Sequence, residues 1–412
     1  MPEQIATTCC IAGGGPAGMV LGYLLARFGV RTVVLEKHAD FLRDFRGDTI
    51  HPSTLEVMAE LGLLDGLLRL PHQKAHELGG IVGDRRIRVA DFTLLPVRCP
   101  FVAFMPQWDF LNYLAQQAGH FPEFDLRLRA EVVGLITERN RVAGVRAQTP
   151  DGPLEVRADL VIGADGRSSV VREVARLRVE CSGAPMDVLW FRLPREAHDP
   201  RDPVGVFGAG AILILIDRGT HWQCGYIIPK GGFEALRQRG LPELTTHIGR
   251  LAPFAAERAA AIASWDDIKL LTVAVDHLPT WWRPGLLCIG DAAHAMSPIG
   301  GVGINLAIQD AVAAANILAA GLKNRHLTDG DLRAVQRRRA WPAHATQQMQ
   351  LLIQRRLIAP ILGDGQVPRP AWPLRVLDSE RWLRRFPARL IGIGVRPEHV
   401  APALLAAGND RA

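Results

Sequence analysis

Apolar and polar residues follow two different periods near the start of the chain. A short apolar run at residues 9–12 is typical of a buried strand, and apolar residues then recur at helical spacing to about residue 28. A second apolar run follows at residues 31–35. Strand, helix and strand in this order predict a βαβ unit in a parallel sheet.

Two later stretches repeat this change from strand to helix. An apolar strand begins at Leu160 and gives way to a helix near Ser168, and another strand ends at Gly290 before a long apolar helix that starts near Gly303. Between them, over residues 187–229, apolar strands follow one another without helices, which favours a mostly antiparallel sheet. We also expect a strand over 127–137, a helical piece over 241–263 and a strand over 268–275.

A glycine fingerprint joins the first strand to its helix. Gly13, Gly15 and Gly18 have the spacing GxGxxG, in which the first glycine permits the turn, the second lets the backbone approach a pyrophosphate, and the third lets the helix pack on the strand. The helix N-terminus attracts the phosphates, and Glu36, at the end of the second strand, can accept from a ribose hydroxyl. The pattern predicts dinucleotide binding. The contact residues expected in this unit are Gly13, Gly15, Pro16, Ala17, Gly18, Glu36 and Lys37.

Composition narrows the class of protein. With 48% hydrophobic and 22% charged residues, the 412-residue chain is typical of a globular protein of more than one domain. The first ten residues lack the basic and apolar regions of a signal peptide, and the longest apolar run, residues 209–216, is too short to cross a bilayer. We therefore expect a cytoplasmic protein without a transmembrane segment.

Cysteine spacing and charge add two restrictions. The six cysteines show no CxxC pair, which excludes the disulfide-reductase branch of flavoenzymes and offers no zinc site. The tail after residue 331 has 14 arginines and 5 acidic residues, a charge of about +9 against +6 for the whole chain, so the preceding part is slightly acidic and we expect no nucleic-acid partner. This tail either packs over the dinucleotide domain, which we favour, or makes peripheral contact with an anionic membrane.

The chain resembles the single-component flavin monooxygenases of the para-hydroxybenzoate hydroxylase fold. The resemblance extends from about residue 5 to residue 318 and rests on three motifs in the family's order. They are Gly13-x-Gly15-x-x-Gly18 with Glu36, then Gly163-x-Asp165-Gly166, and finally Gly290-Asp291-x-x-His294 followed by Pro298-x-Gly300-Gly301-x-Gly303-x-Asn305.

This resemblance implies an α/β fold. It consists of a Rossmann-like FAD-binding domain with an inserted, mostly antiparallel β-sheet substrate domain and a C-terminal helical segment. We assign residues 1–72, 104–178 and 276–330 to the FAD domain, 73–103 and 179–275 to the substrate domain, and 331–412 to the helical region.

The resemblance also implies roles for single residues. Arg46 lies near the FAD phosphates, Gln107 under the ribityl-phosphate chain and Val132 beside the adenine. Further implied FAD contacts are Asp165, Gly166, Asp291, Pro298, Gly301, Gly303, Ile304 and Asn305. His294 is expected to be a packed, hydrogen-bonded histidine, and no side chain is named as a general base.

We expect the glycines at 300, 301 and 303 to bring the backbone against the flavin ring. Candidates for the substrate pocket are His221, Trp222, Gln223 and Tyr226, together with Pro298. The family's sheet arginine near the flavin falls on Gln223, and its substrate-carboxylate residues have no clear equivalents, so a small benzoate substrate is not expected.

The implied activity is that of a monooxygenase with non-covalent FAD. NAD(P)H reduces the flavin, O₂ adds at C4a, and the hydroperoxide hydroxylates an aromatic or other electron-rich small molecule. No second GxGxxG unit indicates a nicotinamide domain, and neither the halogenase signatures nor a thioredoxin-like C-terminal domain is expected. The alternatives are an FAD-dependent reductase or dehydrogenase acting on an isoprenoid or polyketide, and a non-enzymatic flavin-binding regulatory or electron-transfer protein. The oligomeric state is left open.

Overall fold

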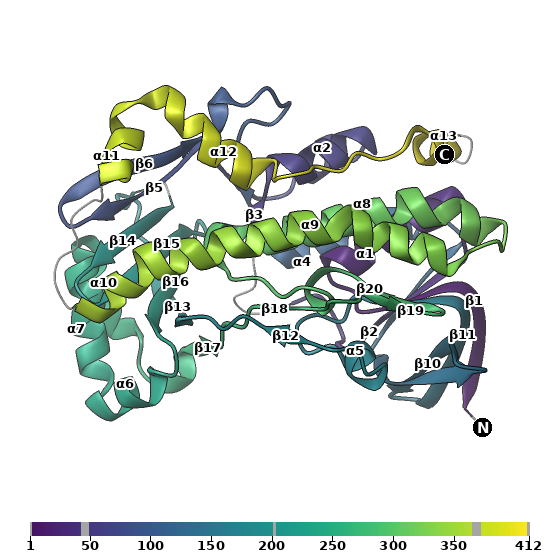
Figure 1. The fold of residues 1–412 in the computed structure, drawn as a ribbon. Coiled ribbons are helices and arrows are strands. Elements are labelled where there is room, and N and C mark those ends of the chain that lie inside the picture. The colour runs from purple at the N-terminus through teal and green to yellow at the C-terminus, as the bar shows by residue number, and fades with distance from the viewer. Residues whose placement is uncertain (1, 43–48, 201–202, 365–371, 410–412) are drawn as a thin grey trace.

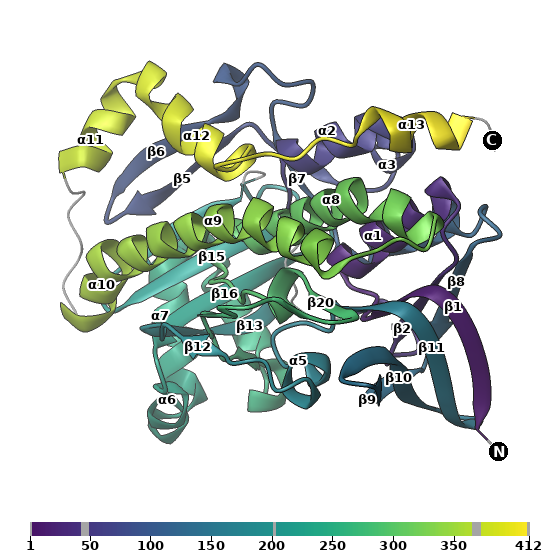
Figure 2. The same ribbon diagram turned by 45° about the vertical axis from the view of Figure 1, so that its right-hand side comes forward.

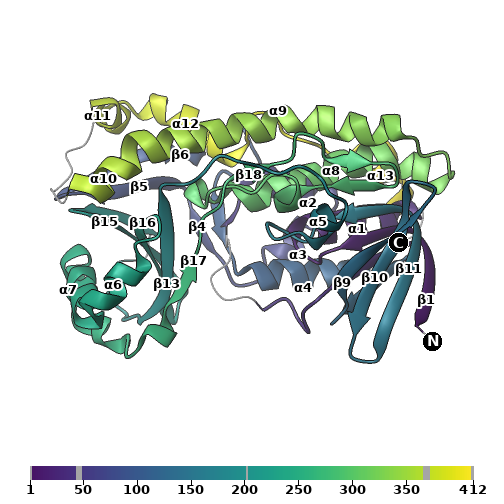
Figure 3. The same ribbon diagram turned by 60° about the horizontal axis from the view of Figure 1, so that its bottom comes forward.

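The computed structural model describes residues 2–42, 49–200, 203–364 and 372–409. Two large sheets stand side by side, each with its own hydrophobic core, and one long helix crosses from one to the other (Figures 1 and 3). The chain passes between the two sheets more than once, so residues far apart in sequence meet where the sheets adjoin.

The first sheet has eight strands around a parallel centre. The centre of this sheet is buried, and helices α1 (Pro16–Phe28), α4 (Gln107–Ala118) and α8 (Val302–Lys323) pack with one another and against it. In spatial order the parallel strands are β20 (Leu286–Cys288), β11 (Gly152–Gly163), β1 (Glu3–Ala12), β2 (Thr32–Glu36) and β8 (Phe124–Leu128). The antiparallel members are β19 (Trp282–Arg283), β10 (Arg141–Thr149) and β9 (Glu131–Glu138).

The second sheet has seven strands, and only the pair β14–β5 is parallel. Helices α6 (Phe233–Arg239) and α7 (Leu241–Leu251) lie over one of its faces. In spatial order the strands are β17 (Lys269–Leu271), β13 (Met186–Pro194), β16 (His221–Pro229), β15 (Ala211–Asp217), β14 (Val204–Gly208), β5 (Glu77–Val82) and β6 (Arg85–Asp91).

Smaller elements connect the two sheets. Strand β3 (Thr49–Ile50) pairs with β7 (Val102–Phe104), which also pairs with β4 (Gln73–Ala75), and β12 (Glu180–Cys181) pairs with β18 (Asp276–His277). The short helices are α2 (Pro52–Glu60), α3 (Leu64–Leu67) and α5 (Val170–Val174).

The C-terminal helices cover both sheets. Helix α9 (Asp329–Ile353) runs along α8 and continues through a π-helical turn (Gln354–Ile358) into α10 (Ala359–Asp364) at the second sheet (Figure 2). Beyond residue 371, α11 (Trp372–Ser379) and α12 (Arg385–Gly392) lie along β6, and α13 (Pro402–Asn409) lies against α1. The tail therefore packs on both parts of the protein. Trp372 and Trp382 stay 74% and 62% exposed, and contact with a membrane stays a prediction.

Three expected elements differ from the structure. The strand expected over 127–137 is two strands, because Arg129 turns the chain with a φ of 55°. The helix expected over 241–263 ends at Leu251, since the residue before Pro253 is driven out of the helical region and short 3₁₀ turns follow. Of the strand expected over 268–275, only Lys269–Leu271 pairs.

One described helical run, Ile299–Lys323, is long and apolar enough to cross a bilayer. This run is longer than the apolar run at residues 209–216, and polar residues such as Asn305 and Asp310 interrupt it. Of its most apolar window, 72% is buried inside the protein, which is typical of a core helix.

His51 ties the start of α2 to the C-terminal tail. Its Nδ1 donates to the carbonyl oxygen of Ile391 at 2.7 Å, and its side chain is only 1% exposed. No described residue bonds to its Nε2. Burial lowers the pKa of His51 to about 4, so the folded protein holds this ring neutral.

Acid should therefore destabilise the fold through His51. The unfolded chain takes up the proton near the ordinary histidine pKa of about 6.5, whereas the folded protein resists it until about pH 4. The stability that the neutral His51 contributes is complete above the unfolded pKa. It is lost as the pH falls from the unfolded pKa to the folded one, which lowers the free energy of unfolding by on the order of 3 kcal/mol. Urea unfolding of the wild type and of His51→Gln at several pH values measures it. Parallel losses of stability in the two proteins would contradict the assignment.

Candidate functional site

The fingerprint turn after β1 has the geometry of a phosphate-binding loop. Gly13 has a φ of 106°, and a Cβ there would lie 2.4 Å from the carbonyl oxygen of Ala164. A Cβ at Gly18 would lie 2.0 Å from the carbonyl oxygen of Gly13. At Gly15, by contrast, no atom lies within 4 Å of where a Cβ would stand, and no side chain caps α1. Packing thus requires two of the glycines, while the third leaves room for a ligand at the helix N-terminus.

Glu36 lies directly over this turn. Its carboxylate accepts from the backbone N–H groups of Gly14 and His38, both at 3.0 Å. The bonds hold the acid at the end of β2, where a ribose would pass, while its neighbour Lys37 is exposed. Pro16 and Ala17 form the first turn of α1.

Asp165 stabilises the turn between β11 and α5. It accepts from the hydroxyl of Ser169 at 2.5 Å and from the backbone N–H of Val171 at 3.1 Å. Burial raises the pKa of Asp165, and these hydrogen bonds only partly offset it. The carboxylate therefore faces α5, and the neighbouring Gly166, with a φ of 83°, has no atom within 4 Å of a would-be Cβ.

The segment 290–301, which we call the 290–301 loop, joins β20 to α8. At its start, Asp291 is half-buried and lies 3.5 Å from a guanidinium nitrogen of Arg167. At its end, Gly301 has a φ of 64°, and a Cβ there would lie 2.2 Å from Oγ1 of Thr49. Gly301 is thus required by its backbone conformation and by Thr49. The contact with the flavin ring expected of this glycine stays a prediction.

Asn305 joins the first turn of α8 to α2. Its amide nitrogen donates to the carbonyl oxygens of Thr49 and Gly301, and its oxygen accepts from the backbone N–H of His51 and the hydroxyl of Thr54. These bonds use the whole capacity of an amide side chain. Any contact of Asn305 with a ligand therefore falls to its backbone. Gly303 and Ile304, in the same turn, are half-buried.

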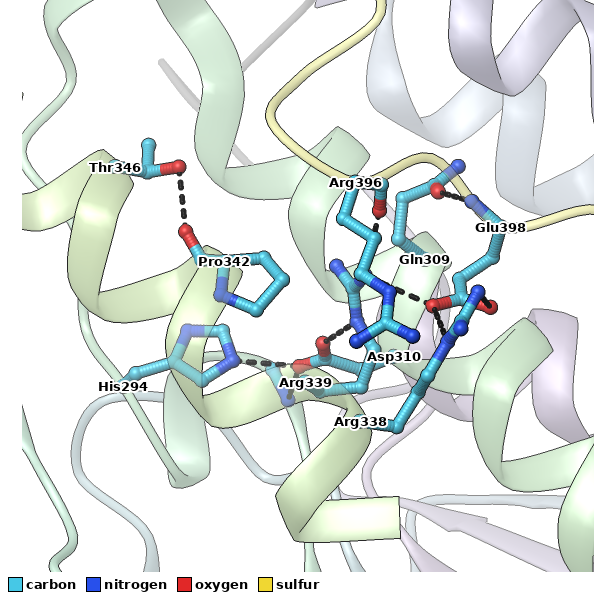
Figure 4. A network of polar contacts seen from close by, with 10 residues as sticks. His294, Gln309, Asp310, Arg338, Arg339, Pro342, Thr346, Arg396 and Glu398 are labelled. Atoms are coloured by element: carbon cyan, nitrogen blue, oxygen red, sulfur yellow. Dashed lines mark hydrogen bonds and ion pairs between the residues drawn. The ribbon is translucent and has the colours of Figure 1, made fainter.

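A buried ionic network fixes the other end of the loop (Figure 4). Asp310 of α8 accepts from the backbone N–H of Gly290 at 3.1 Å, from Nε2 of His294 at 2.5 Å and from Nε of Arg339 at 2.9 Å. Arg339 also donates to Glu398 of the tail at 3.1 Å. Burial would raise the pKa of Asp310, but His294 and Arg339 outweigh it and hold the pKa below its ordinary value. His294 is thus packed and hydrogen-bonded, as expected.

The substrate-pocket candidates on β16 divide between the two faces of the sheet. Trp222 and Tyr226 point toward the face covered by α7. The indole donates to Asp199, between β13 and β14, at 2.8 Å, and the tyrosine hydroxyl lies 2.6 Å from Nδ1 of His247 on α7. Gln223 points the other way and accepts from Nε of Arg218 at 2.9 Å, while His221 is half-buried at the start of the strand.

The opposite face of the second sheet is the one that meets the 290–301 loop. Ile299, next to Pro298, packs there with Ile212 and Ile227. Trp222 and Tyr226 were therefore assigned to the right strand, but their side chains lie on the face away from this loop. Side chains alternate along a strand, so only residues in register with Gln223 can face the loop.

One aromatic residue on this face was not expected from the sequence. Trp190 of β13 lies across Gly225 of β16, since a Cβ at Gly225 would lie 3.1 Å from the indole ring. Trp190 is half-buried beside Ile214, between two apolar clusters. A glycine inside a strand often marks such a close approach, and Gly225 was the available signal.

The remaining expected residues are spread along the first sheet. Gln107 begins α4, and Val132 is buried on β9 opposite Ala147. Arg46 lies outside the described residues.

These features fit FAD. Two helix N-termini without side-chain caps, those of α1 and α8, are available for its pyrophosphate and for the electron-rich edge of its ring. Gly15 and Gly166 leave open the space that a Cβ would fill, and Glu36 stands at the expected ribose position.

A family model described as FAD binding domain matches residues 6–349. The chain belongs to this family. Membership confirms the resemblance inferred from the three motifs and the expected cofactor, FAD.

Relatives of this FAD-binding protein indicate its class. It is 35% identical, over 86% of its length and 85% of the relative's, to 6-methylpretetramide 4-monooxygenase from Streptomyces rimosus. It is 27% identical, over 75% of its length and 64% of the relative's, to dialkyldecalin synthase from Streptomyces rugosporus. The solved structure of p-nitrophenol 4-monooxygenase from Pseudomonas putida matches its fold with a TM-score of 0.77 and 21% identity, covering 96% of this chain and 100% of that one.

These matches confirm the expected fold class and identify the chain as an FAD-dependent monooxygenase. The division into domains and the individual cofactor contacts stay predictions.

Glu36 should contribute directly to FAD affinity. Replacing it with alanine removes a charged acceptor from the expected ribose position, which costs about 1–3 kcal/mol of binding free energy. Fluorescence titration of the apoprotein with FAD measures the change. Glu138→Ala, at an exposed acid on the β9–β10 hairpin, is the control and should bind FAD as the wild type does. Equal affinities for all three proteins would remove Glu36 from the site.

Proposed function

We propose that this monooxygenase uses NAD(P)H and O₂ to hydroxylate a polycyclic, phenol-like aromatic compound. The observation that carries this substrate class is the 35% identity, over most of both chains, to an enzyme named for 6-methylpretetramide. The reaction consumes NAD(P)H, O₂, a proton and the aromatic C–H compound. It gives NAD(P)⁺, water and the hydroxylated product.

The face of the second sheet toward the 290–301 loop suits such a substrate. Trp190 offers a flat ring over Gly225, and Ile214 and Ile216 add apolar surface next to it. Gln223 places an amide in the same region, and an amide can bond to a phenolic hydroxyl. A flat surface with few polar groups matches a large aromatic compound better than a small benzoate.

When bound, FAD supplies the reduction of O₂ and the transfer of one oxygen atom to the substrate. The residues of this chain bind, orient and exclude water. The N-terminus of α8, without a side-chain cap, stabilises negative charge near residues 302–304. Ile299 packs against the apolar cluster of the second sheet, and this contact keeps water from the place where the loop meets the sheet.

A specific observation favours a second candidate. Dialkyldecalin synthase shares 27% identity with this chain and is not named as a monooxygenase. The fold thus occurs in a relative whose name denotes a synthase. We favour hydroxylation over a synthase activity for this chain, because its identity to the pretetramide enzyme is higher and covers more of both chains.

An isotope experiment distinguishes these functions. The enzyme, NAD(P)H and a panel of polycyclic phenols are incubated under ¹⁸O₂, and products are analysed by mass spectrometry. We expect one ¹⁸O atom in the product for each NAD(P)H consumed in coupled turnover. An unlabelled oxidised or reduced product indicates a dehydrogenase or reductase, and an isomer formed without NAD(P)H indicates a synthase. NAD(P)H oxidation that no compound stimulates would favour a regulatory or electron-transfer protein.

Trp190 should determine the affinity for the aromatic substrate. Trp190→Ala removes a stacking surface, and we expect KM to rise on the order of tenfold while FAD affinity stays unchanged. Trp190→Phe should recover most of the loss. Trp372→Ala, at an exposed indole of α11, is the control. Unchanged KM in Trp190→Ala would place the substrate elsewhere.

A further inference from the structure

One face of helix α9 and of the π-helical turn that continues it carries three buried glutamines. Gln347, Gln350 and Gln354 are separated by three and four residues, which places them on one side of a helix. Their exposed fractions are 2%, 1% and 0%, whereas Gln348 between them is exposed. Buried glutamine is uncommon and needs hydrogen-bond partners.

The partners of all three side chains belong to one region. Gln347 Nε2 donates to the carbonyl oxygens of Asp276 and Ala295, at 2.8 and 3.0 Å. Gln350 Nε2 donates to those of Ser297 and Ile299, at 3.0 and 2.9 Å. These are three consecutive odd-numbered carbonyls of the 290–301 loop, together with one from the adjoining strand β18.

The third glutamine, Gln354, bonds to a side chain of the same loop. Gln354 Nε2 donates to the hydroxyl oxygen of Ser297 at 2.6 Å. Each amide therefore uses its donor nitrogen on the loop, and no described residue bonds to Oε1 of Gln350 or Gln354. Because a carbonyl oxygen can only accept, the direction of the bonds to Ala295, Ser297 and Ile299 is fixed by chemistry.

Without α9, this part of the loop would have few donors for its carbonyls. Apart from the glutamines, the carbonyl of Ala295 accepts from the backbone N–H of Asp276 at 3.3 Å. Bonds within the loop span only two or three residues, such as the backbone N–H of Ile299 to the hydroxyl of Ser297 at 3.4 Å and that of Gly301 to the carbonyl of Pro298 at 3.1 Å. Buried carbonyls without donors are costly, so the amides of α9 set where this backbone can lie.

The π-helical turn and α10, which continue α9, reach the second sheet. Ile358 and Leu362, one to two turns beyond Gln354, share an apolar cluster with Ile212 and Ile227, and Ile299 packs against that cluster. The loop is thus held between α9 and the face that carries Trp190.

We propose that Gln347, Gln350 and Gln354 are positioning residues for the flavin. By holding the carbonyls of the 290–301 loop, they fix the loop against the ring, and this placement determines how much of the NAD(P)H consumed leads to hydroxylated product. The part concerning the flavin rests on family membership. The part concerning product rests on the function proposed above.

The test compares the same substitution at two neighbouring positions. Gln350→Glu keeps the size of the side chain but, when ionised, removes both donors and directs a negative charge at two carbonyl oxygens. Gln348→Glu makes the same change at an exposed position. For each protein we would measure FAD affinity, the absorption spectrum of bound FAD, thermal unfolding, and product and H₂O₂ formed per NAD(P)H, from pH 6 to 9.

For Gln350→Glu we expect weaker FAD binding by at least fivefold, a changed flavin spectrum and a larger share of H₂O₂. These differences from the wild type should grow as the pH rises, because a protonated carboxyl can still donate one hydrogen bond and a carboxylate cannot. Gln348→Glu should match the wild type throughout. A general loss of stability would not give a flavin spectrum that depends on the titration of residue 350.

If Gln350→Glu does not fold, Gln350→Met retains the volume, adds no charge and removes both donors. It should reproduce the changes in FAD affinity and spectrum without their pH dependence. FAD affinity and spectrum equal to those of the wild type, in whichever of the two variants folds, would overturn the proposal. These two readouts need no substrate, so they decide it even if the hydroxylase function fails.

Discussion

The position of the 290–301 loop depends on the elements packed around it. The loop lies where the resemblance places the flavin ring, and its glycines allow a close approach but supply no side chains to pack. Its backbone is therefore held by other elements. Asp310 fixes its start, Thr49 and Asn305 fix its end, and the glutamines of α9 hold the carbonyls between them. The architecture around the loop follows from this requirement.

Helix α9 can hold the loop because α9 and the helical segments that continue it are anchored at both ends. Toward the first sheet, Arg339 bonds to Asp310 and Glu398, so a buried cation is matched by two acids and the tail is drawn onto α8. Removing one member would leave a buried charge without its partner, which typically costs several kcal/mol. Toward the second sheet, Ile358 and Leu362 are buried against its strands. The C-terminal helices thus form a rigid support that links the FAD domain to the proposed substrate surface.

Features dictated by the backbone were readable in the sequence. The spacing of Gly13, Gly15 and Gly18 with Glu36 predicted the βαβ unit and its turn, because a tight turn and a close approach admit few other residues. The orientation of β16 was not readable in the same way: both faces of this strand are apolar, so alternation gave no sign of which side Trp222 or Gln223 would take. The role of Gln350 was also hidden, since its partners lie some fifty residues away and only folding brings them together. Arg46 lies outside the described residues and stays a prediction.

The most direct test is a crystal structure of the protein with FAD bound. The account predicts that the isoalloxazine ring lies against the 290–301 loop, beside the face of the second sheet that carries Trp190. The bonds from Gln347 and Gln350 to the loop carbonyls should remain in place. A ring bound away from this loop, or a loop that leaves α9 when FAD binds, would contradict it.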